Sequence, residues 1–293
     1  MTEAAPRADG AESDHVVRAI TDDDNFRVIT ACTTHTVRQA LAAQQAAGNT
    51  ARHFADLITG TVLIRETMSP THRVQGLLKG AGGRGNLVAD THPDGLTRGL
   101  VQLPKDLDEF RLGPGSVLQM MRSMARGGIH RSMVQPSAEG TVPEALMTYM
   151  QESEQIVAMI ATGLSWDGDR VAHAGGFVVQ LLPGASRGPL MIMTERLEAM
   201  PRIDELLGEL DGSPHKLLEE LLYQMPFAQL DIRPVTFGCK CSHQAVVASL
   251  ASIDREELAD MVRDSEVIEL SCDYCHTEYR ISRAHLRGLL ESS

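Results

Sequence analysis

The segments FGCKCS, at residues 237–242, and CDYC, at residues 272–275, decide the fold of the carboxyl-terminal part of this chain. They contain four of its five cysteines in the patterns C-x-C and C-x-x-C, separated by 30 residues: Cys239, Cys241, Cys272 and Cys275. Four thiolates from two tight turns can complete the tetrahedral shell of a zinc ion, and they leave no position for a catalytic water. The spacing therefore predicts one Zn²⁺ per chain in a structural site, with the four cysteines reduced.

Other interpretations of the cysteine pattern stay open on spacing alone. The site could be a structural zinc knuckle with no switching role. His243 or His276, which lie beside the cysteines, could replace one of them as a ligand. A fixed pair of disulfides would require a secreted protein, yet the amino terminus has neither a basic n-region nor an apolar h-region. We therefore expect a cytoplasmic protein, in which clustered cysteines indicate metal or redox chemistry.

The composition argues against two classes of partner. The 293 residues include 27 basic and 39 acidic side chains, a net charge of −12, and no basic patch, so we expect no binding to nucleic acid. No uninterrupted apolar run reaches the length of a membrane span, so we expect no membrane contact. Aromatic residues are scarce at 4%, and 14 methionines supply adaptable apolar surface instead.

The pattern along the chain predicts an α+β protein in four parts. A tail with little to bury precedes a mixed core domain with a β-sheet and packed helices. A helical, metastable linker and a small zinc-binding domain follow. The predicted bounds are residues 1–13 for the disordered tail, 14–187 for the core, 188–238 for the linker and 239–293 for the zinc-binding domain.

Hydrophobic periodicity assigns elements within the core. Apolar spacing predicts two antiparallel helices between Thr34 and Met68, broken around Gly48-Asn49, and a further helix over residues 143–159. Short β-like runs bounded by turn residues predict a meander and then a hairpin. The meander strands are residues 73–79, 86–90 and 97–103, and the hairpin strands are residues 160–166 and 170–182.

The linker differs from the core in composition. Residues 188–238 hold nine acidic and four basic side chains and four methionines, and runs such as LEAMPRIDELLGEL, at residues 197–210, indicate amphipathic helices. Prolines and glycines keep these helices short, and short helices are marginal in water. We therefore expect the linker to stay folded only while its Leu and Met faces pack against a neighbour.

The predicted zinc-binding domain mixes helices and strands. We expect a helix capped by Asp254 with Glu257 three residues on, strands over residues 267–270 and up to Ile281, and a last helix capped by Ser282. A nucleic-acid-binding zinc ribbon is the main alternative function, but the domain holds six basic and ten acidic residues. A thiol oxidoreductase is a third hypothesis, and the strands on both sides of the C-x-x-C pair argue against its usual βαβ setting.

Three other features each have two interpretations. The run from Gly80 to Gly85 matches the G-x-G-x-x-G dinucleotide fingerprint, but a strand follows it, so a hairpin loop is favoured. A methionine cluster is either core or a surface that binds other proteins. Cys32 lacks the neighbouring positive charges of a reactive thiolate, which favours an inert buried thiol. The cluster comprises Met120, Met121, Met124 and Met133.

Together these residues resemble the heat shock protein 33 family over nearly the whole chain. The cysteine segments, with Tyr279 after the second, are the most specific part of the resemblance. Four further segments resemble the family in the same order: Asp14-His15 with Arg18-Ala19, Gly82 to Asn86, Glu152-Ser153-Glu154-Gln155 and Ala174-Gly175-Gly176.

The resemblance implies a redox-regulated holdase chaperone rather than an enzyme. Its reduced, zinc-bound form would be inactive, and oxidation would form the disulfides Cys239–Cys241 and Cys272–Cys275 and release the zinc. Such disulfides close tiny loops and restrain little of the chain, so the long-range cross-link would be lost. In this family the oxidised protein then partly unfolds, forms a homodimer and holds unfolded client proteins without ATP. Residues 188–238 match the family's metastable linker.

The sequence departs from the family pattern at three places. His276 replaces the usual glycine, which we expect to alter the turn or the acidity of Cys275. His243-Gln244-Ala245 replace charged residues common after Cys241, which puts the oxidation threshold in doubt. The amino-terminal tail is longer than usual and has no assigned role.

Overall fold

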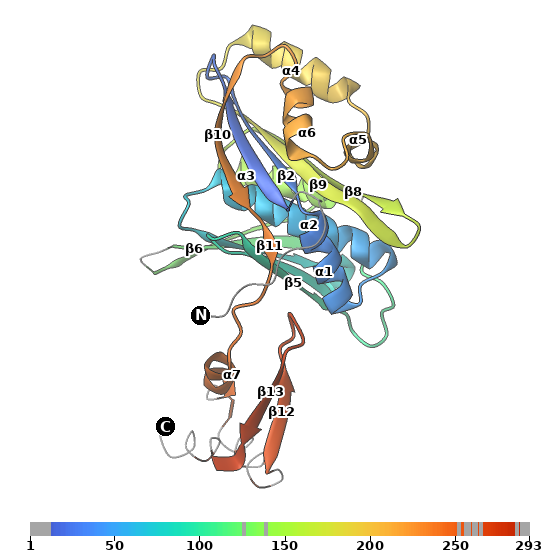
Figure 1. The fold of residues 1–293 in the computed structure, drawn as a ribbon, viewed down its shortest axis with the longest axis vertical. Helices are drawn as coiled ribbons and strands as arrows, with labels where there is room; N and C mark the ends of the chain where they lie inside the picture. The colour runs from blue at the N-terminus through green and yellow to red at the C-terminus, as the bar shows by residue number, and fades with distance from the viewer. Residues whose placement is uncertain are drawn as a thin grey trace.

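The computed structural model describes residues 13–124, 127–137, 140–250, 253–254, 259, 263, 266–284 and 287. It confirms the α+β class, with two larger antiparallel sheets and a small one. Helices lie between the two larger sheets, and further helices cover the outer face of one of them (Figure 1). Apart from Ser13, the predicted disordered tail lies outside the described residues. Among the described helices, none is long and apolar enough to cross a membrane.

The first sheet joins strands from both ends of the core with a strand from the last part of the predicted linker. Its order is β10-β1-β2-β9-β8, with every neighbouring pair antiparallel. Alternation along the strands sends Val16 and Ile29 to one face and Val17 and Val28 to the other. The sheet is therefore apolar on both faces and needs cover on both. The strands are β1 (His15–Thr21), β2 (Phe26–Cys32), β8 (Ala158–Asp167), β9 (Arg170–Leu181) and β10 (Phe227–Pro234).

The second sheet contains the predicted meander. Its order is β11-β5-β4-β3-β6-β7, and all pairs are antiparallel except the short parallel pair of β11 with β5. The glycine run forms the loop between β3 and β4, with a 3₁₀ turn (η1, Ala81–Gly83) and no helix behind it, so it is not a dinucleotide fingerprint. The strands are β3 (Arg73–Lys79), β4 (Asn86–Thr91), β5 (Leu96–Gln102), β6 (Val117–Ser123), β7 (Ile129–Val134) and β11 (Thr236–Phe237).

Three helices form the layer between the sheets. The predicted helix pair is confirmed as α1 (Thr34–Gln44) and α2 (Gly48–Thr67), and α2 contacts β3 and β4 on one side and β8 and β9 on the other. The third helix, α3, spans Val142–Glu152. The prediction of a helix up to residue 159 was wrong, because the chain turns at Gln155 with a left-handed φ of 57° and enters β8 at Ala158.

The predicted linker forms three helices, but not along its whole length. Helices α4 (Arg187–Ala199), α5 (Ile203–Glu209) and α6 (Pro214–Leu221) lie on the outer face of the first sheet (Figure 1). Beyond them the helical prediction was wrong, because Phe227–Pro234 forms β10 along the open edge of β1. Pairing there satisfies the backbone groups of that edge, which outweighs any local helix preference.

The carboxyl-terminal module extends below the second sheet (Figure 1). It contains α7 (His243–Leu250), which the sequence analysis missed, and the antiparallel strands β12 (Val267–Ser271) and β13 (Glu278–Ser282), which it predicted. Asp254 is described, but Glu257 lies outside the described residues, as does most of each helix predicted to follow Asp254 and Ser282. Among the described residues its apolar cluster has only two fully buried members, Leu250 and Ile281.

Candidate metal centre

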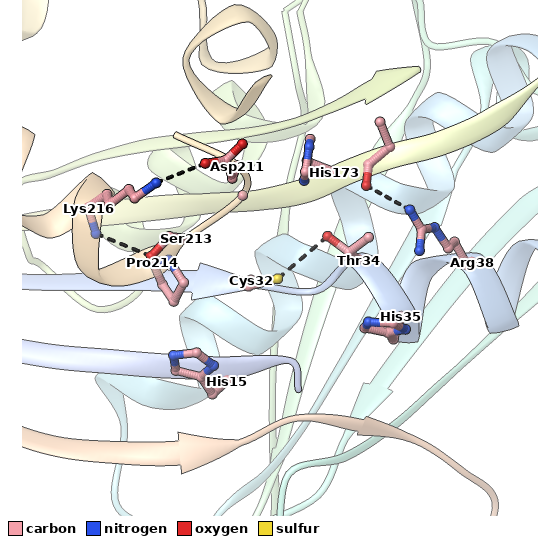
Figure 2. Close-up of a pocket in the computed structure, with 12 residues that line it drawn as sticks. His15, Cys32, Thr34, His35, Arg38, His173, Asp211, Ser213, Pro214 and Lys216 are labelled. Carbon is pink, nitrogen blue, oxygen red and sulfur yellow. Dashed lines mark hydrogen bonds and ion pairs between the residues drawn. The ribbon is translucent and has the colours of Figure 1, made fainter. Parts of the chain in front are cut away.

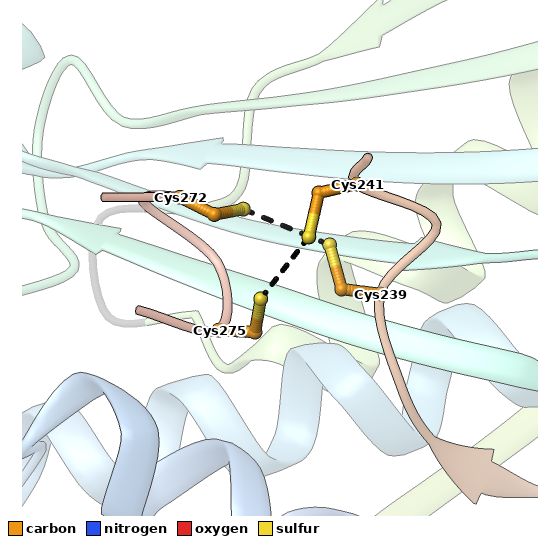
Figure 3. Close-up of side chains that lie close together, drawn as sticks. All are labelled: Cys239, Cys241, Cys272 and Cys275. Atoms are coloured by element: carbon orange, nitrogen blue, oxygen red, sulfur yellow. Dashed lines mark hydrogen bonds between the residues drawn. The ribbon is translucent and has the colours of Figure 1, made fainter. Parts of the chain in front are cut away.

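Two loops bring the four cysteine side chains together (Figure 3). Cys239 and Cys241 follow β11, while Cys272 and Cys275 lie in the turn between β12 and β13. That turn is closed by the backbone N–H of His276, which donates to the Cys272 carbonyl at 2.7 Å, and by the N–H of Cys272, which donates to the Thr277 carbonyl at 3.0 Å. Each loop thus contributes two sulfur atoms, and these face the two sulfur atoms of the other loop.

The positions of the sulfur atoms fit a tetrahedral metal. All four Sγ atoms lie within 4.8 Å of one another, and the group includes neither His243 nor His276. The Sγ atoms of Cys239 and Cys272 are 3.7 Å apart, and those of Cys241 and Cys275 are 3.4 Å apart. Sulfur atoms around zinc, with bonds near 2.3 Å, would lie about 3.8 Å apart. The cluster can therefore hold a metal ion, and its donor set suits zinc.

His276 adopts the conformation that its place in the turn requires. Its φ is 55°, in the left-handed region that favours glycine. Histidine enters this region more readily than most residues do. The turn keeps the hydrogen bonds of a closed knuckle despite the replacement, so His276 does not disrupt the knuckle.

Three side chains outside the cysteine set contact its sulfur atoms. The Tyr279 hydroxyl donates to Cys241 Sγ at 3.0 Å, and Arg98 Nη1 donates to Cys239 Sγ at 3.0 Å. Thr277 Oγ1 lies 3.2 Å from Cys275 Sγ. Such outer contacts orient ligands and tune their basicity.

In the metal-free reduced chain the thiols differ in acidity. Burial raises the pKa of Cys241, and although the Tyr279 hydroxyl opposes this, neighbouring thiols bring that pKa to about 12. Burial would also raise the pKa of Cys275, but hydrogen bonds from Thr277 and from neighbouring thiols outweigh it and lower the pKa to about 7. Burial raises the pKa of Cys272 as well. Cys275 is therefore the more acidic end of the Cys241–Cys275 pair.

Sequence reasoning missed the residues of the core that touch the metal centre. Arg98 on β5 and Gln44 on α1 both contact the carboxyl-terminal module. No motif marks them, because Arg98 and Cys239 are 141 positions apart in the sequence. Only the arginine's place in a strand that faces the module makes it a neighbour of the cysteines.

Cys32 is not part of the cysteine cluster and lies beside a pocket (Figure 2). The pocket has a volume of about 420 Å³ and is formed where the turn before α6 meets β1, β9 and α1. Cys32 Sγ lies 3.5 Å from both Asp14 Oδ1 and Thr34 Oγ1. Burial, together with the Asp14 carboxylate, raises the pKa of Cys32 to about 11. This agrees with the expectation of an unreactive thiol.

The predicted methionine cluster is divided between core and surface. Met120 is buried in the main core, whereas Met124 and Met133 are exposed on the β6–β7 hairpin. Met121 is half-buried between these extremes. The cluster therefore does not act as a single surface.

Comparison with known proteins gives consistent results. The family model described as "Hsp33 protein" matches residues 14–282. A 33 kDa chaperonin from Syntrophotalea carbinolica is 31% identical, covering 94% of this chain and 99% of its own length. One from Geobacter sp. strain M21 is 30% identical, covering 95% and 97%. The crystal structure of the 33 kDa chaperonin of Thermotoga maritima superposes with a TM-score of 0.81 at 22% identity, over 96% of this chain and 99% of that one.

The Tyr279 hydroxyl generates a prediction about metal affinity. We expect Tyr279→Phe to weaken zinc binding about tenfold, because it removes a hydrogen bond to one ligand and keeps the ring. Competition with a chromogenic chelator measures the change. Tyr223→Phe, at an exposed tyrosine, is the matched control. Equal affinities of Y279F and the parent chain would contradict the role given to the hydroxyl.

The environment of Cys32 generates a second prediction. A thiol with a pKa of about 11 is deprotonated in about one molecule in ten thousand at pH 7, and this fraction rises about tenfold per pH unit. We therefore expect iodoacetamide to label Cys32 in the folded protein only slowly at pH 7 and much faster near pH 10. Mass spectrometry of the labelled peptide measures this, with the denatured chain as the control. Rapid labelling of folded protein at pH 7 would overturn the interpretation.

Proposed function

The chain belongs to the Hsp33 family of chaperones, and from that premise we propose that it is a redox-regulated, ATP-independent holdase. In this proposal, Cys239, Cys241, Cys272 and Cys275 bind one Zn²⁺ in the reduced, inactive form. Oxidation to two local disulfides activates the protein to bind unfolded clients and prevent their aggregation. The division into core, linker and zinc-binding domain, at residues 14–187, 188–238 and 239–293, is part of the same proposal.

The carboxyl-terminal module depends on the cysteines for its stability. The described part of its apolar cluster is small, and few of the module's described residues are fully buried. When bound, zinc cross-links the two cysteine loops, and in small zinc domains it contributes on the order of 10 kcal/mol to folding. In this proposal the cysteines hold together a module whose described apolar cluster is too small to do so alone.

Oxidation changes which parts of the chain the sulfur atoms connect. Each adjacent pair of thiolates loses two electrons and forms one S–S bond. With a peroxide as oxidant, two molecules of H₂O₂ take up the four electrons, together with four protons from the solvent, and become four molecules of water. The proposed disulfides, Cys239–Cys241 and Cys272–Cys275, lie within single loops and restrain little of the chain. No bond then joins the loop after β11 to the loop after β12.

The linker covers an apolar surface that its loss would expose. Leu217, Leu218 and Leu221 of α6 pack against β1 and β2, within a cluster that also includes Phe26 and Phe177. Helix α6 has eight residues, too few to persist without this packing. Release of the linker would uncover one face of the first sheet and the apolar faces of the helices. Both surfaces suit an unfolded client.

Other elements of the proposal follow from charge and chemistry. The module holds six basic and ten acidic residues, which supports proteins rather than nucleic acid as partners. All five cysteines are free, as expected in a reducing compartment such as the cytoplasm. We include homodimerisation of the oxidised form, because exposed apolar faces can pair with a second copy. We propose no enzymatic activity.

The convergence of four free cysteines on one point, in a chain of this family, carries the proposal. Its test is peroxide treatment with mild warming, followed by zinc release, disulfide mapping and aggregation of a denatured client. We expect about one zinc per chain to leave, the two local disulfides to form, and aggregation to be suppressed until a thiol reductant is added. Cross-disulfides such as Cys239–Cys272, or zinc loss without a gain in activity, would count against it.

The linker generates a further prediction. We expect Leu221→Ala to weaken docking of α6 by about 2–5 kcal/mol, because the side chain is fully buried between helix and sheet. The reduced, zinc-loaded variant should then suppress client aggregation partly, without oxidant. Leu230→Ala, at a half-exposed leucine on β10, is the matched control. An L221A protein as inactive as the parent would argue against the linker as the element that blocks activity.

A further inference from the structure

A buried carboxylate on β4 is shared by two arginines of neighbouring strands. Asp90 is fully buried and accepts two hydrogen bonds from Arg73, from Nε and Nη2, each at 2.6 Å. It also accepts one from Arg98 Nε at 2.9 Å. Burial alone would raise the pKa of Asp90, but the hydrogen bonds from these arginines outweigh it and lower the pKa. Two positive charges therefore share one negative charge, and the bidentate Arg73 leaves Arg98 the freer of the two.

Arg98 directs its remaining donors at the metal centre. While its Nε is held by Asp90, its Nη1 donates to Cys239 Sγ at 3.0 Å. Its Cζ lies 4.0 Å from the centre of the Tyr274 ring, within the range of a cation–π contact. A single side chain of the core thus touches both cysteine loops, one through a ligand and the other through the residue before Cys275.

Hydrogen bonds to backbone groups surround the arginine in the seam between the core and the carboxyl-terminal module. Strand β11 pairs with β5 at the position next to Arg98, and the N–H of Gly238 donates to the Thr97 carbonyl at 3.0 Å. The Gln44 amide accepts from the Val101 N–H at 2.9 Å and donates to the Asp273 carbonyl at 2.8 Å. These contacts are neutral, and the exposed ion pair of Lys240 with Asp94 in the same seam, 2.8 Å long, involves no sulfur, so none of them distinguishes a thiolate from a disulfide. The Arg98 contact does.

We propose that Arg98 is the positioning residue by which the core recognises the reduced cysteines: it holds the carboxyl-terminal module while Cys239 is a thiolate and releases it when Cys239 is oxidised. The inference deepens the proposed function and rests on it. A thiolate is a charged acceptor, whereas a disulfide sulfur is neutral and a weak one. Oxidation by a peroxide removes that charge in the step balanced above. Arg98 then keeps its contacts with Asp90, which Arg73 already neutralises, and with the Tyr274 ring, and neither of these holds the Cys239 loop.

The release would be transmitted towards the linker by a short covalent path. Cys239 follows Gly238 directly, and the N–H of Thr236 donates to the Gly95 carbonyl at 3.1 Å in the same seam. Strand β11 leads back to β10, which pairs with β1 at the edge of the sheet that the linker helices cover. Loosening at Arg98 thus reaches the strand that anchors the end of the linker.

The test compares Arg98→Gln with the parent chain by hydrogen exchange, in full-length, reduced and zinc-loaded protein. We expect exchange in peptides covering residues 236–239 and 273–275 to rise about tenfold, as for the loss of one charged hydrogen bond. Arg98→Lys keeps the charge but cannot make both contacts in one geometry, so it should show a smaller rise. Arg84→Gln, at an exposed arginine paired with Asp106, is the matched control.

Exchange of these peptides at the parent rate in zinc-loaded R98Q would overturn the inference. If R98Q fails to fold, two other variants take its place: R98K, and Tyr274→Leu, which leaves the Asp90 contacts intact. Unchanged exchange rates of these peptides in both variants would reject the inference. In the parent chain, exchange must also rise in the same peptides after oxidation. These exchange rates do not depend on holdase activity. If the oxidised chain failed to suppress client aggregation, the proposed function would be refuted, but the role of Arg98 would still be decided by the exchange rates.

Discussion

Four sulfur atoms lie within 4.8 Å of one another although their loops are separated by 30 residues, and in the proposed function a metal ion bound there joins the two loops of the carboxyl-terminal module. The described apolar cluster of the module is too small to replace it. The pKa values of the thiols also differ, so the cysteines of the metal-free cluster are not chemically equivalent. A fold held by a few sulfur atoms can be taken apart by chemistry that touches only those atoms, which is the physical basis of a redox switch.

The first sheet links this local chemistry to a large surface. One of its faces packs on α2 within the main core, and the other packs on α4, α5 and α6. The inner cover is a twenty-residue helix buried between two sheets, whereas the outer cover consists of short helices with one side in solvent. The chain leaves the sheet at β9 and returns to it as β10, so the outer cover is tied to the same sheet at both ends. In the proposed mechanism, this outer layer of linker helices is the part that is released from the sheet.

Sequence patterns predicted the elements whose apolar spacing reflects one buried face. The α1–α2 pair, the meander of β3, β4 and β5, and the β8–β9 hairpin all formed as expected. Predictions failed where a neighbour distant in sequence supplied the stabilisation. β10 is a strand because β1 offers an unpaired edge, and α3 ends early because Gln155 takes a left-handed turn into β8. The two longest-range contacts of the metal centre, to Arg98 and Gln44, carry no local signal at all.

The sequence by itself determined the family and identified the four clustered cysteines as the candidate ligands. Cysteine chemistry is set by residue type and close spacing, and two tight turns suffice to define a four-thiolate site. Only the tertiary structure decided what surrounds that site: that Arg98 reaches Cys239, that Asp90 and Arg73 orient it, and that β10 closes the sheet beneath the linker. The physical reason is that hydrogen bonds and strand pairing act between groups brought close in space, and sequence distance places no limit on them.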